Sequence, residues 1–363
     1  MVSSSVATGQ AAFLRYDRTL GAAAMEGRGF YYPVDLAVRG DGGMYGLSRS
    51  HEGDPRGVRV CILDYDGGFH GVFGSIGDAD GQFIFATAIA LDSRGRVYVS
   101  DEHTQRISVF DKAGTFLSKW GTRGSGPGEI DGPCGLAFGP DDVLYVTDHL
   151  NHRIQTFTPE GTHLSGFGEH GSGDGQFDLP WGITVLPDGQ VYVADWRNDR
   201  IQRFSAGGEF IAAYGESGDG DGQFRRPSGV AVDSDGYIYV ADWGNDRVQV
   251  LDPDGDFVQK LMGEATLSTW GAEFLEANVD EAGARARSNL EPDPVAKGWT
   301  PAEAPRYVEK LFWAPTAVKL DSKGRLYVVD RNRHRIQVYQ KDAISPRPDQ
   351  IGPPVRTPAT GTA

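Results

Sequence analysis

Residues 222–251 read GQFRRPSGVAVDSDGYIYVADWGNDRVQVL, and residues 175–204 read GQFDLPWGITVLPDGQVYVADWRNDRIQRF. Both stretches alternate short β-branched and aromatic runs with glycine-containing turns, which is typical of short strands joined by tight turns. Pro133, Pro180 and Pro227 hold the same place in this unit and follow one another at intervals of 47 residues. A fixed period in the forties predicts either a solenoid or a propeller.

The unit recurs six times along the chain. Ala86 opens an earlier copy in the same phase, and two degenerate copies begin with FYYP at residues 30–33 and FWAP at residues 312–315. Each complete copy contains four strand-like runs, so the pattern predicts an all-β, six-bladed β-propeller that occupies residues 1–342 as one domain. The Pro- and Thr-rich residues 343–363 are expected to form a loosely ordered tail.

The last copy ends before its fourth strand. A substitute lies near the N-terminus, where FLRY at residues 13–16 resembles FLSKW at residues 116–120, the fourth strand of a complete copy. We expect residues 11–20 to supply this strand to the last blade, because that pairing closes the ring and removes an exposed sheet edge.

The repeat can be assigned to a known type from its most regular segments. GVAVD at residues 229–233 followed by DWGNDRVQVL at residues 242–251 resembles the NHL repeat, and similar copies cover about residues 30–340. The resemblance implies a six-bladed NHL propeller. It does not imply one activity, because NHL propellers include amidating lyases, RNA-binding domains, ubiquitin-ligase targeting domains and scaffolds.

The whole chain also resembles bacterial proteins that are likened to peptidyl-hydroxyglycine amidating lyases. In that family, histidines after the blade-opening proline bind zinc, an arginine of the first blade holds the substrate, and a loop tyrosine acts as base. GLSR at residues 46–49 matches the segment with the arginine, and His103 lies near the position of the tyrosine. All six positions after the blade-opening residue lack histidine, so we expect neither that zinc site nor another cofactor.

Composition narrows the possible partners and location. The 363 residues carry a formal net charge of −15 and a pI near 4.9, which opposes attraction to phosphate backbones and anionic membranes. We therefore expect no nucleic-acid or membrane partner. No apolar stretch is long enough for a membrane span, and the first ten residues lack the apolar core of a signal peptide. Cys61 and Cys134 are expected to be free buried thiols of a cytoplasmic protein.

Some repeated residues are interpreted as purely structural. An aspartate and an arginine five residues later recur in five copies, which favours a pair that ties the loop between the second and third strands of each blade, with the arginine bonded to carboxylate or carbonyl oxygens. These pairs are Asp101 and Arg106, Asp148 and Arg153, Asp195 and Arg200, Asp242 and Arg247, and Asp330 and Arg335. The repeated Phe83, Phe177 and Phe224 are expected to fill gaps between blades.

Function is sought where the copies differ. Pro33 and Ala86 are 53 residues apart instead of 47, which places six extra residues in the loop at 48–58. Pro227 and Pro315 are 88 residues apart, which places an insert at about residues 264–306. Because successive antiparallel strands run in opposite directions, the long loop and the insert are expected on the same face of the propeller. Elaborated loops commonly carry function. The insert is expected to contain one or two amphipathic helices, either as a lid over the central funnel or packed on a blade edge.

A candidate pocket lies at the mouth of the funnel on this face. The residues after each blade opening point toward the axis in this architecture, and loops between the second and third strands add further side chains. The opening residues are Val34, Thr87, Cys134, Trp181, Ser228 and Thr316. The loop residues are Arg49, His51, Glu102, His103, His149, Trp196, Arg197, Trp243 and Arg331. This combination of aromatic and titratable residues is expected of a small-ligand site.

Two functions remain open. In the first, the protein is a metal-independent lyase or hydrolase with Arg49, His51, His103 and His149 as catalytic candidates, Arg49 binding a carboxylate and His103 or His149 acting as base. Its ligand would contact Thr87, Cys134, Trp181, Trp196, Arg197, Trp243 and Arg331. In the second, the same face grips a protein or peptide partner without catalysis. A metal site made by His51, His103 and His149 is a less favoured alternative.

Overall fold

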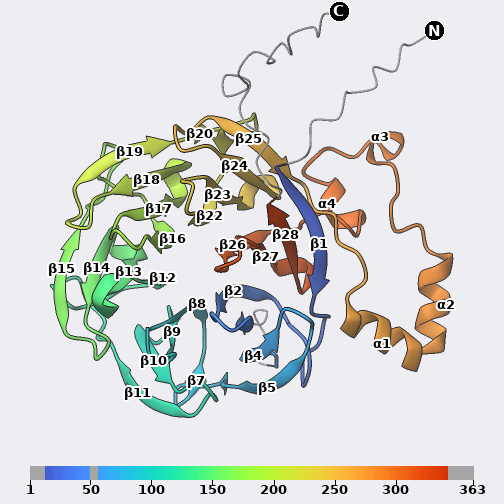
Figure 1. The fold of residues 1–363 in the computed structure, drawn as a ribbon, viewed down its shortest axis with the longest axis horizontal. Helices are drawn as coiled ribbons and strands as arrows, with labels where there is room; N and C mark the ends of the chain where they lie inside the picture. The colour runs from blue at the N-terminus through green and yellow to red at the C-terminus, as the bar shows by residue number, and fades with distance from the viewer. Residues whose placement is uncertain (1–12, 50–55, 342–363) are drawn as a thin grey trace, which may run out of the picture.

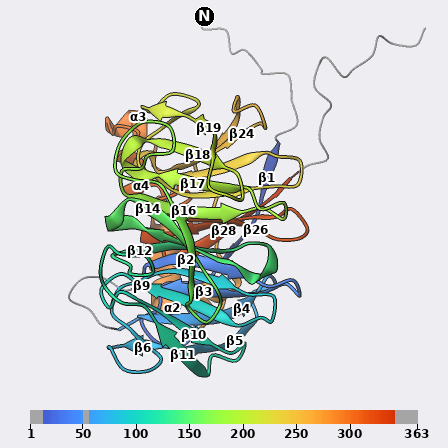
Figure 2. The same cartoon turned by 90° about the vertical axis from the view of Figure 1, so that its left-hand side faces the viewer.

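Six four-stranded antiparallel sheets form a ring in the computed structural model, which describes residues 13–49 and 56–341 (Figure 1). Figure 2 shows the ring from its edge, with strands running between its two faces. The innermost strand of every sheet begins at the residue that opens the sequence repeat, such as Pro180 or Pro227. The all-β, six-bladed propeller predicted from the repeat is therefore confirmed.

The first three blades follow the chain without interruption. Blade 1 contains β2 (Pro33–Val38), β3 (Gly43–Ser48), β4 (Arg59–Asp64) and β5 (Phe69–Phe73). Blade 2 contains β8 (Ala86–Leu91), β9 (Val97–Asp101), β10 (Arg106–Phe110) and β11 (Phe116–Trp120). Blade 3 contains β12 (Pro133–Phe138), β13 (Leu144–Asp148), β14 (Arg153–Phe157) and β15 (His163–Phe167). Short parallel pairs join β6 (Ser75–Ile76) to β7 (Gln82–Phe83) and, later, β20 (Glu216–Ser217) to β21 (Gln223–Phe224).

The remaining blades repeat the same order. Blade 4 contains β16 (Pro180–Val185), β17 (Val191–Asp195), β18 (Arg200–Phe204) and β19 (Phe210–Tyr214). Blade 5 contains β22 (Pro227–Val232), β23 (Ile238–Asp242), β24 (Arg247–Leu251) and β25 (Phe257–Leu261). Blade 6 contains β26 (Pro315–Leu320), β27 (Leu326–Asp330) and β28 (Arg335–Lys341). Short 3-10 turns follow several strands: η1 (Pro140–Asp142), η2 (His149–Asn151), η3 (Trp196–Asn198), η4 (Trp243–Asn245) and η5 (Arg331–Arg333).

The N-terminal strand closes the ring as predicted. β1 (Leu14–Leu20) pairs antiparallel with β28, from Leu14 opposite Lys341 to Leu20 opposite Ile336. Figure 1 shows this first strand, in blue, beside the last strand, in red. Residues 11 and 12 of the predicted closing segment, and the predicted tail at 343–363, lie outside the described residues. Because β1 covers the outer edge of β28, the last blade is left with the same four strands as its neighbours.

The predicted wedge phenylalanines lie between blades. Phe83, Phe177 and Phe224 are completely buried. Phe177 packs with Ile154 of blade 3 and Val191 of blade 4. The glycine that ends the preceding blade is required by this packing: at Gly168, where φ is +90°, an added Cβ would lie 2.4 Å from the Phe177 ring.

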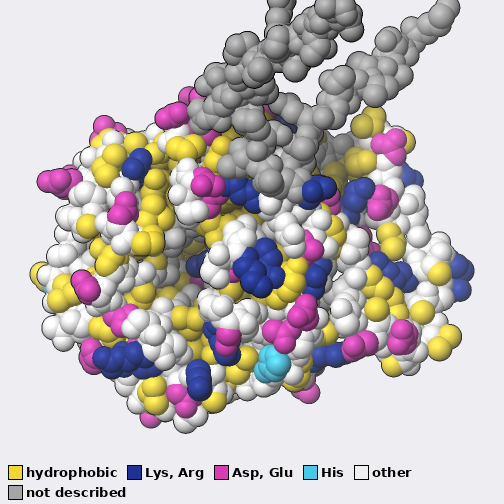
Figure 3. Space-filling model, viewed as in Figure 1, with side chains coloured by type: hydrophobic (Ala, Val, Ile, Leu, Met, Phe, Trp, Pro, Cys, Tyr) yellow, Lys and Arg dark blue, Asp and Glu magenta, His cyan; other side chains and the backbone are white. Residues whose placement is uncertain are grey.

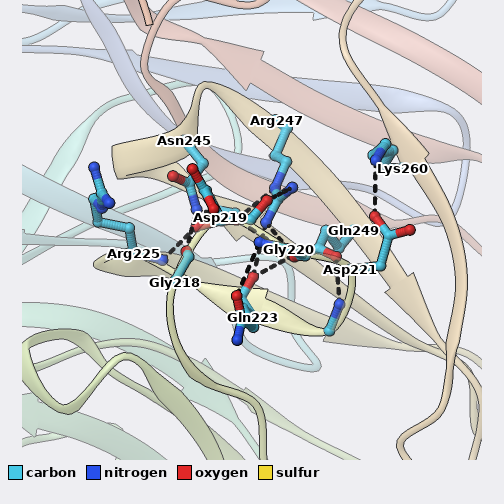
Figure 4. A network of polar contacts seen from close by, with 12 residues as sticks. Gly218, Asp219, Gly220, Asp221, Gln223, Arg225, Asn245, Arg247, Gln249 and Lys260 are labelled. Carbon is cyan, nitrogen blue, oxygen red and sulfur yellow. Dashed lines mark hydrogen bonds and ion pairs between the residues drawn. The ribbon is translucent and has the colours of Figure 1, made fainter. Parts of the chain in front are cut away.

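The repeated aspartate and arginine form ion pairs in blades 3 to 6. The distances from the arginine Nε to the aspartate Oδ2 are 2.8, 2.9, 2.7 and 2.8 Å for Arg153, Arg200, Arg247 and Arg335. Figure 4 shows how Arg247 also donates to three backbone carbonyls of the preceding connection. These pairs hold loops, as expected from their repetition.

Blade 2 differs from blades 3 to 6 in this contact. Arg106 donates to the carbonyl oxygens of Asp78, Ala79 and Gln82, and no ion pair joins it to Asp101 among the described residues. Asp101 instead accepts four backbone N–H groups, including those of His103 and Thr104. The carboxylate is therefore satisfied without the guanidinium, and Arg106 follows the carbonyl alternative of the prediction.

A second repeated contact, which we call the junction latch, joins neighbouring blades. A side chain at the end of the 3-10 turn accepts the backbone N–H of the residue before the next blade opens. The five acceptor and donor pairs in the described residues are Gln105 with Gly132, His152 with Leu179, Asp199 with Arg226, Asp246 with Ala314, and His334 with Tyr32. Every donor residue has a positive φ between 49° and 67°. Four of the five donors are not glycine, so at four of these junctions the latch holds a strained backbone.

The insert lies beside the ring. It contains α1 (Thr269–Ala277), α2 (Val279–Arg287), α3 (Pro294–Lys297) and α4 (Ala304–Tyr307). Figure 1, which looks through the ring, shows these helices outside it and not over its centre. Within the part of the chain that the structure describes, no helix is long and apolar enough to cross a membrane.

Packing of one tryptophan explains this position. Trp270 is 2% exposed, lies 6.1 Å from the ring centroids of both Phe30 and Phe69, and donates from Nε1 to the Gly67 carbonyl at 2.5 Å. The insert therefore buries its main apolar group against the outer part of the first and last blades. The prediction of a partly helical insert is confirmed, and its interpretation as a lid over the funnel is corrected.

Candidate functional site

One end of the ring axis opens into a pocket, which we call the funnel mouth. It encloses about 500 Å³, open mouth included. The starts of the innermost strands contribute Val34, Thr87, Trp181, Ser228 and Thr316, and the loops between second and third strands contribute Arg49, Trp196, Trp243 and Arg331. The prediction that the strand starts and the loops between second and third strands share one face is therefore correct. All nine lining residues are among the predicted pocket residues, and six of them are predicted catalytic or ligand-contact residues: Arg49, Thr87, Trp181, Trp196, Trp243 and Arg331.

The opposite face is less distinctive. Figure 3 shows the face from which the two chain ends project, where acidic and basic side chains are interspersed. The hollow at this end is lined by the ends of the innermost strands, such as Leu91, Phe138 and Leu320. Apart from Lys319, its lining residues are uncharged. We therefore place the candidate site at the funnel mouth.

Three tryptophans form one wall of the funnel mouth. The ring centroids of Trp181 and Trp196 are 6.2 Å apart, and those of Trp196 and Trp243 are 6.4 Å apart. Trp196 and Trp243 hold equivalent places at the starts of η3 and η4, so the repeat places one tryptophan at the same point of blades 4 and 5. All three side chains are half-buried. Their faces offer a broad apolar surface that suits a flat ligand group.

Arg49 and Arg331 supply positive charge to the same pocket. Arg49 pairs with Glu102 at 2.5 Å and lies 4.8 Å from the Phe85 ring centroid. Arg331 pairs with no carboxylate among the described residues, and its buried Nε has no hydrogen-bond partner. Burial, followed by repulsion from Arg49, lowers the pKa of Arg331. A partly desolvated guanidinium without an anion is energetically costly, so the pocket favours an incoming anion.

His149 lies close behind the tryptophan wall. Its side chain is buried, and its ring contacts Trp181 edge-on at 5.0 Å. Nδ1 donates to the Pro180 carbonyl at 3.0 Å, which leaves Nε2 as the unprotonated nitrogen of the neutral ring. Burial lowers the pKa of His149, so the ring is neutral at pH 7. These properties suit a general base, although His149 does not line the funnel mouth itself.

The other candidates lie elsewhere. His103 is exposed, packs near the Phe85 ring and does not line the funnel mouth. Cys134 is buried deeper, where burial raises the pKa of its thiol, and its Sγ lies 3.7 Å from Glu102 Oε2. Arg197 is exposed and lines a neighbouring open groove with Arg225, Arg226 and Trp243. His51 lies outside the described residues, so its prediction stays untested.

Comparisons with known proteins agree with the repeat analysis. The family described as NHL repeat matches residues 177–204, 224–251 and 312–339, and a family described as a 6-bladed β-propeller matches residues 88–130. No curated protein sequence matches the chain. The protein is therefore a six-bladed β-propeller. More specifically, it is a propeller that carries NHL repeats.

Several solved structures are similar in fold. A streptogramin B lyase is 13% identical with a TM-score of 0.54, covering 92% of this chain and all of the other. A catalytically inactive virginiamycin B lyase from Staphylococcus aureus, solved with quinupristin, is 13% identical with a TM-score of 0.53 and coverages of 92% and 90%. A protein of unknown function from Bacteroides thetaiotaomicron is 18% identical with a TM-score of 0.56 and coverages of 91% and 76%. At these identities the likeness shows the fold alone.

Proposed function

We propose that the funnel mouth binds a small ligand that carries both an anionic group and a flat apolar group. The observation that carries the proposal is Arg331, a half-buried arginine that lines the same pocket as three tryptophans. Its buried Nε has no hydrogen-bond partner, and no carboxylate of the described residues pairs with it. An anion beside Arg331 would supply the counter-charge that this arginine lacks among the described residues, and it would offset the repulsion from Arg49, which is itself paired with Glu102. The Trp181, Trp196 and Trp243 wall would then hold the rest of the ligand.

We further propose that this ligand is the substrate of a lyase or hydrolase reaction that needs no metal in the funnel. Arg49 and Arg331 would stabilise negative charge that develops on the substrate. His149 would be the general base, because it is neutral at pH 7 with Nε2 unprotonated. Neither histidine lines the funnel mouth, but His149 contacts Trp181 of its wall, whereas His103 is exposed and is therefore less suited. Similar folds named as lyases support catalysis only by analogy.

A thermal-shift screen of small aromatic carboxylates and phosphates on the full chain tests the binding proposal. We expect a compound that raises the unfolding temperature of the wild type but not of Arg331→Gln or Trp196→Ala. Arg197→Gln is the matched control, because this arginine is exposed outside the funnel mouth. If no compound acts through Arg331, or if Arg197→Gln abolishes the effect equally, the ligand assignment is wrong.

Catalysis is tested separately on any compound that binds. We expect turnover by the wild type and a loss of kcat in His149→Gln, whose amide can still donate to the Pro180 carbonyl. His103→Gln should retain activity. Binding without turnover would leave the ligand site standing and remove the enzyme assignment.

The alternative is a scaffold that binds a protein or peptide on the same face. The open groove between blades 4 and 5 favours it, because Arg197, Arg225 and Arg226 are exposed there beside Trp243, and arginine and tryptophan are common interface anchors. Stoichiometric capture of a partner that Arg225→Glu abolishes would support this function. For both the enzyme and the scaffold we propose a cytoplasmic location, which is supported by two buried cysteines that are not paired with each other.

A further inference from the structure

We propose that His152, His170 and Asp178 form a binding site for a divalent transition-metal ion of the zinc type. The three candidate ligand atoms lie within 4.8 Å of one another. Asp178 Oδ1 is 3.6 Å from His152 Nδ1 and 3.8 Å from His170 Nε2. Two imidazoles and one carboxylate are a common ligand set for zinc, and small side-chain rotations would bring these atoms to one ion.

The site lies at the junction of blades 3 and 4, outside the funnel mouth. It is independent of the ligand proposed there, because none of its three residues lines that pocket. His152 and Asp178 are half-buried and His170 is exposed, so an ion could reach the site from solvent. The inference therefore goes beyond the proposed function and does not depend on it.

The repeat provides an internal comparison for this cluster. The positions equivalent to His152, His170 and Asp178 lie one repeat period of 47 residues earlier and later in the chain, at the neighbouring junctions. The junction of blades 2 and 3 has Gln105, Arg123 and Asp131, and the junction of blades 4 and 5 has Asp199, Ser217 and Arg225. In the first, Arg123 pairs with Asp131 at 3.4 Å, and in the second, Ser217 donates to Asp199 at 2.6 Å. Of these three junctions, the one between blades 3 and 4 alone carries three metal-ligating side chains.

Backbone contacts hold all three residues in place. The Asp178 N–H donates to Asp195 Oδ1 at 2.8 Å, and its carbonyl accepts the Arg197 N–H at 3.0 Å. His170 forms a parallel bridge with Phe177, and the His152 N–H donates to the His149 carbonyl. A metal would therefore need to order side chains only, since the backbone positions are already set.

One existing contact competes with the metal. His152 Nδ1 accepts the Leu179 N–H of the junction latch at 3.1 Å. A metal bound to this nitrogen must replace that hydrogen bond, so binding at the site and the latch are linked. Because Nδ1 accepts this hydrogen bond, it carries a lone pair and no proton, and it can act as a metal ligand once the hydrogen bond is released.

The site would leave coordination positions open to water or to a further ligand. Asp178 also lines the groove that contains Arg197, Arg225 and Arg226. These arginines would favour an anion as the exogenous ligand, because they supply positive charge beside the ion. The class of ligand expected at the open positions is therefore a small carboxylate or phosphate.

Isothermal titration of the chelator-treated full chain with zinc chloride at pH 7 tests the proposal. The decisive variant is His152→Gln with His170→Arg, which recreates the Gln, Arg and Asp set of the junction between blades 2 and 3. Gln105 shows that glutamine can keep the latch, since its Oε1 accepts the Gly132 N–H at 2.6 Å. The double variant should therefore fold, and its circular dichroism and unfolding midpoint without zinc should match the wild type.

We expect the wild type to bind one equivalent of zinc, and the double variant to lose more affinity than the about 10–100-fold that removal of an outer-shell partner costs. Zinc should also raise the unfolding temperature of the wild type and not that of the double variant. His70→Ala is the matched control, because His70 is an exposed histidine that pairs with Asp64 at 2.7 Å and belongs to no three-ligand cluster in the described residues. Failure of the wild type to bind zinc, or equal binding by the folded double variant, would overturn the proposal.

Discussion

His334 accepts, through Nδ1, a hydrogen bond from the backbone N–H of Tyr32 at 2.9 Å, and the two residues are 302 positions apart in the sequence. Their rings also meet edge-on, with centroids 4.6 Å apart. Tyr32 has a φ of 49°, a conformation that non-glycine residues rarely adopt. The contact therefore joins the last blade to the first at a strained point, in addition to the β1 and β28 pairing.

This latch predicts a loss of stability in mild acid. Burial, and then the charge of Arg333, lowers the pKa of His334 from its usual 6.5 to about 4. The unfolded chain binds the proton at a higher pH than the folded protein does, so the free energy of unfolding decreases as pH falls from about 6.5 to about 4. His334→Gln keeps an acceptor and removes the titration. We expect the variant to lose about 1 kcal/mol less than the wild type between pH 7 and pH 5, allowing for partial exposure.

Urea unfolding midpoints at the two pH values provide the measurement. His103→Gln is the control, because His103 is exposed and makes no latch, and its pH dependence should equal that of the wild type. An unchanged pH dependence in His334→Gln would contradict the role assigned to this histidine.

The latch between blades 5 and 6 predicts the opposite pH dependence. Burial raises the pKa of Asp246 from 3.8 to about 6, against the hydrogen bond that its Oδ1 accepts from the Ala314 N–H. The folded protein therefore holds this proton more tightly, and the contribution of Asp246 to stability falls as pH rises from about 3.8 to about 6. Asp246→Asn should be more stable than the wild type at pH 7.5, by about 1 kcal/mol, and similar to it at pH 4.5.

Chemical unfolding at these pH values would measure the difference. Asp199→Asn is a suitable comparison, because Asp199 makes the same latch but also accepts the Ser217 hydroxyl. If Asp246→Asn were the less stable protein at pH 7.5, the charged carboxylate would be needed for the latch and the prediction would fail.

The fold could be predicted from the sequence because two separate features of the repeat point to it. The period of 47 residues predicts blades, and the unpaired last copy predicts the closing strand that β1 supplies. The junction latch was not predicted, because its acceptors are Gln, His or Asp and share only a position and a hydrogen-bonding capacity. A search for any acceptor at this phase, rather than for one residue type, could have found it.

The site was predicted less completely for a similar reason. Strand parity brought Trp181, Trp196 and Trp243 together, since each position follows from the repeat. His103 was misplaced relative to the pocket because a loop position does not determine the direction of its side chain. The insert was equally ambiguous: its length and helix pattern were readable, whereas the burial of Trp270 depends on a contact with Phe30 more than 200 residues earlier.

Trp270 should anchor the insert to the ring. Its replacement by alanine removes a buried aromatic side chain and the hydrogen bond to the Gly67 carbonyl, a change that typically costs about 3–5 kcal/mol. We expect faster limited proteolysis within residues 264–306 in Trp270→Ala. Phe274→Ala is the matched control, because Phe274 lies on the same helix and is 53% exposed. Equal proteolysis rates for the two variants would show that the insert is held in another way.

The repeated arginines should be structural. Arg247 is 4% exposed, pairs with Asp242 at 2.7 Å and donates to the carbonyls of Asp219, Gly220 and Gln223 (Figure 4). Arg247→Ala leaves a buried carboxylate and several carbonyls without donors, which should cost about 3–5 kcal/mol of unfolding free energy. Arg247→Lys should recover only part of it, because an ammonium cannot reproduce the planar set of donors. Urea unfolding of both variants tests the order.

Replacement of Arg331 should affect stability in the opposite direction from replacement of Arg247. It has no carboxylate partner among the described residues, and the neighbouring Arg49 lowers its pKa further after burial. Replacing this cation with an uncharged side chain removes a repulsion and an unsatisfied charge, so Arg331→Gln should unfold at an equal or higher urea concentration than the wild type. A stabilised variant that no longer binds the funnel ligand would indicate that the arginine is retained for binding at the expense of stability. A loss of stability as large as that of Arg247→Ala would instead make Arg331 a structural residue, and the anion site at the funnel mouth would lose its main support.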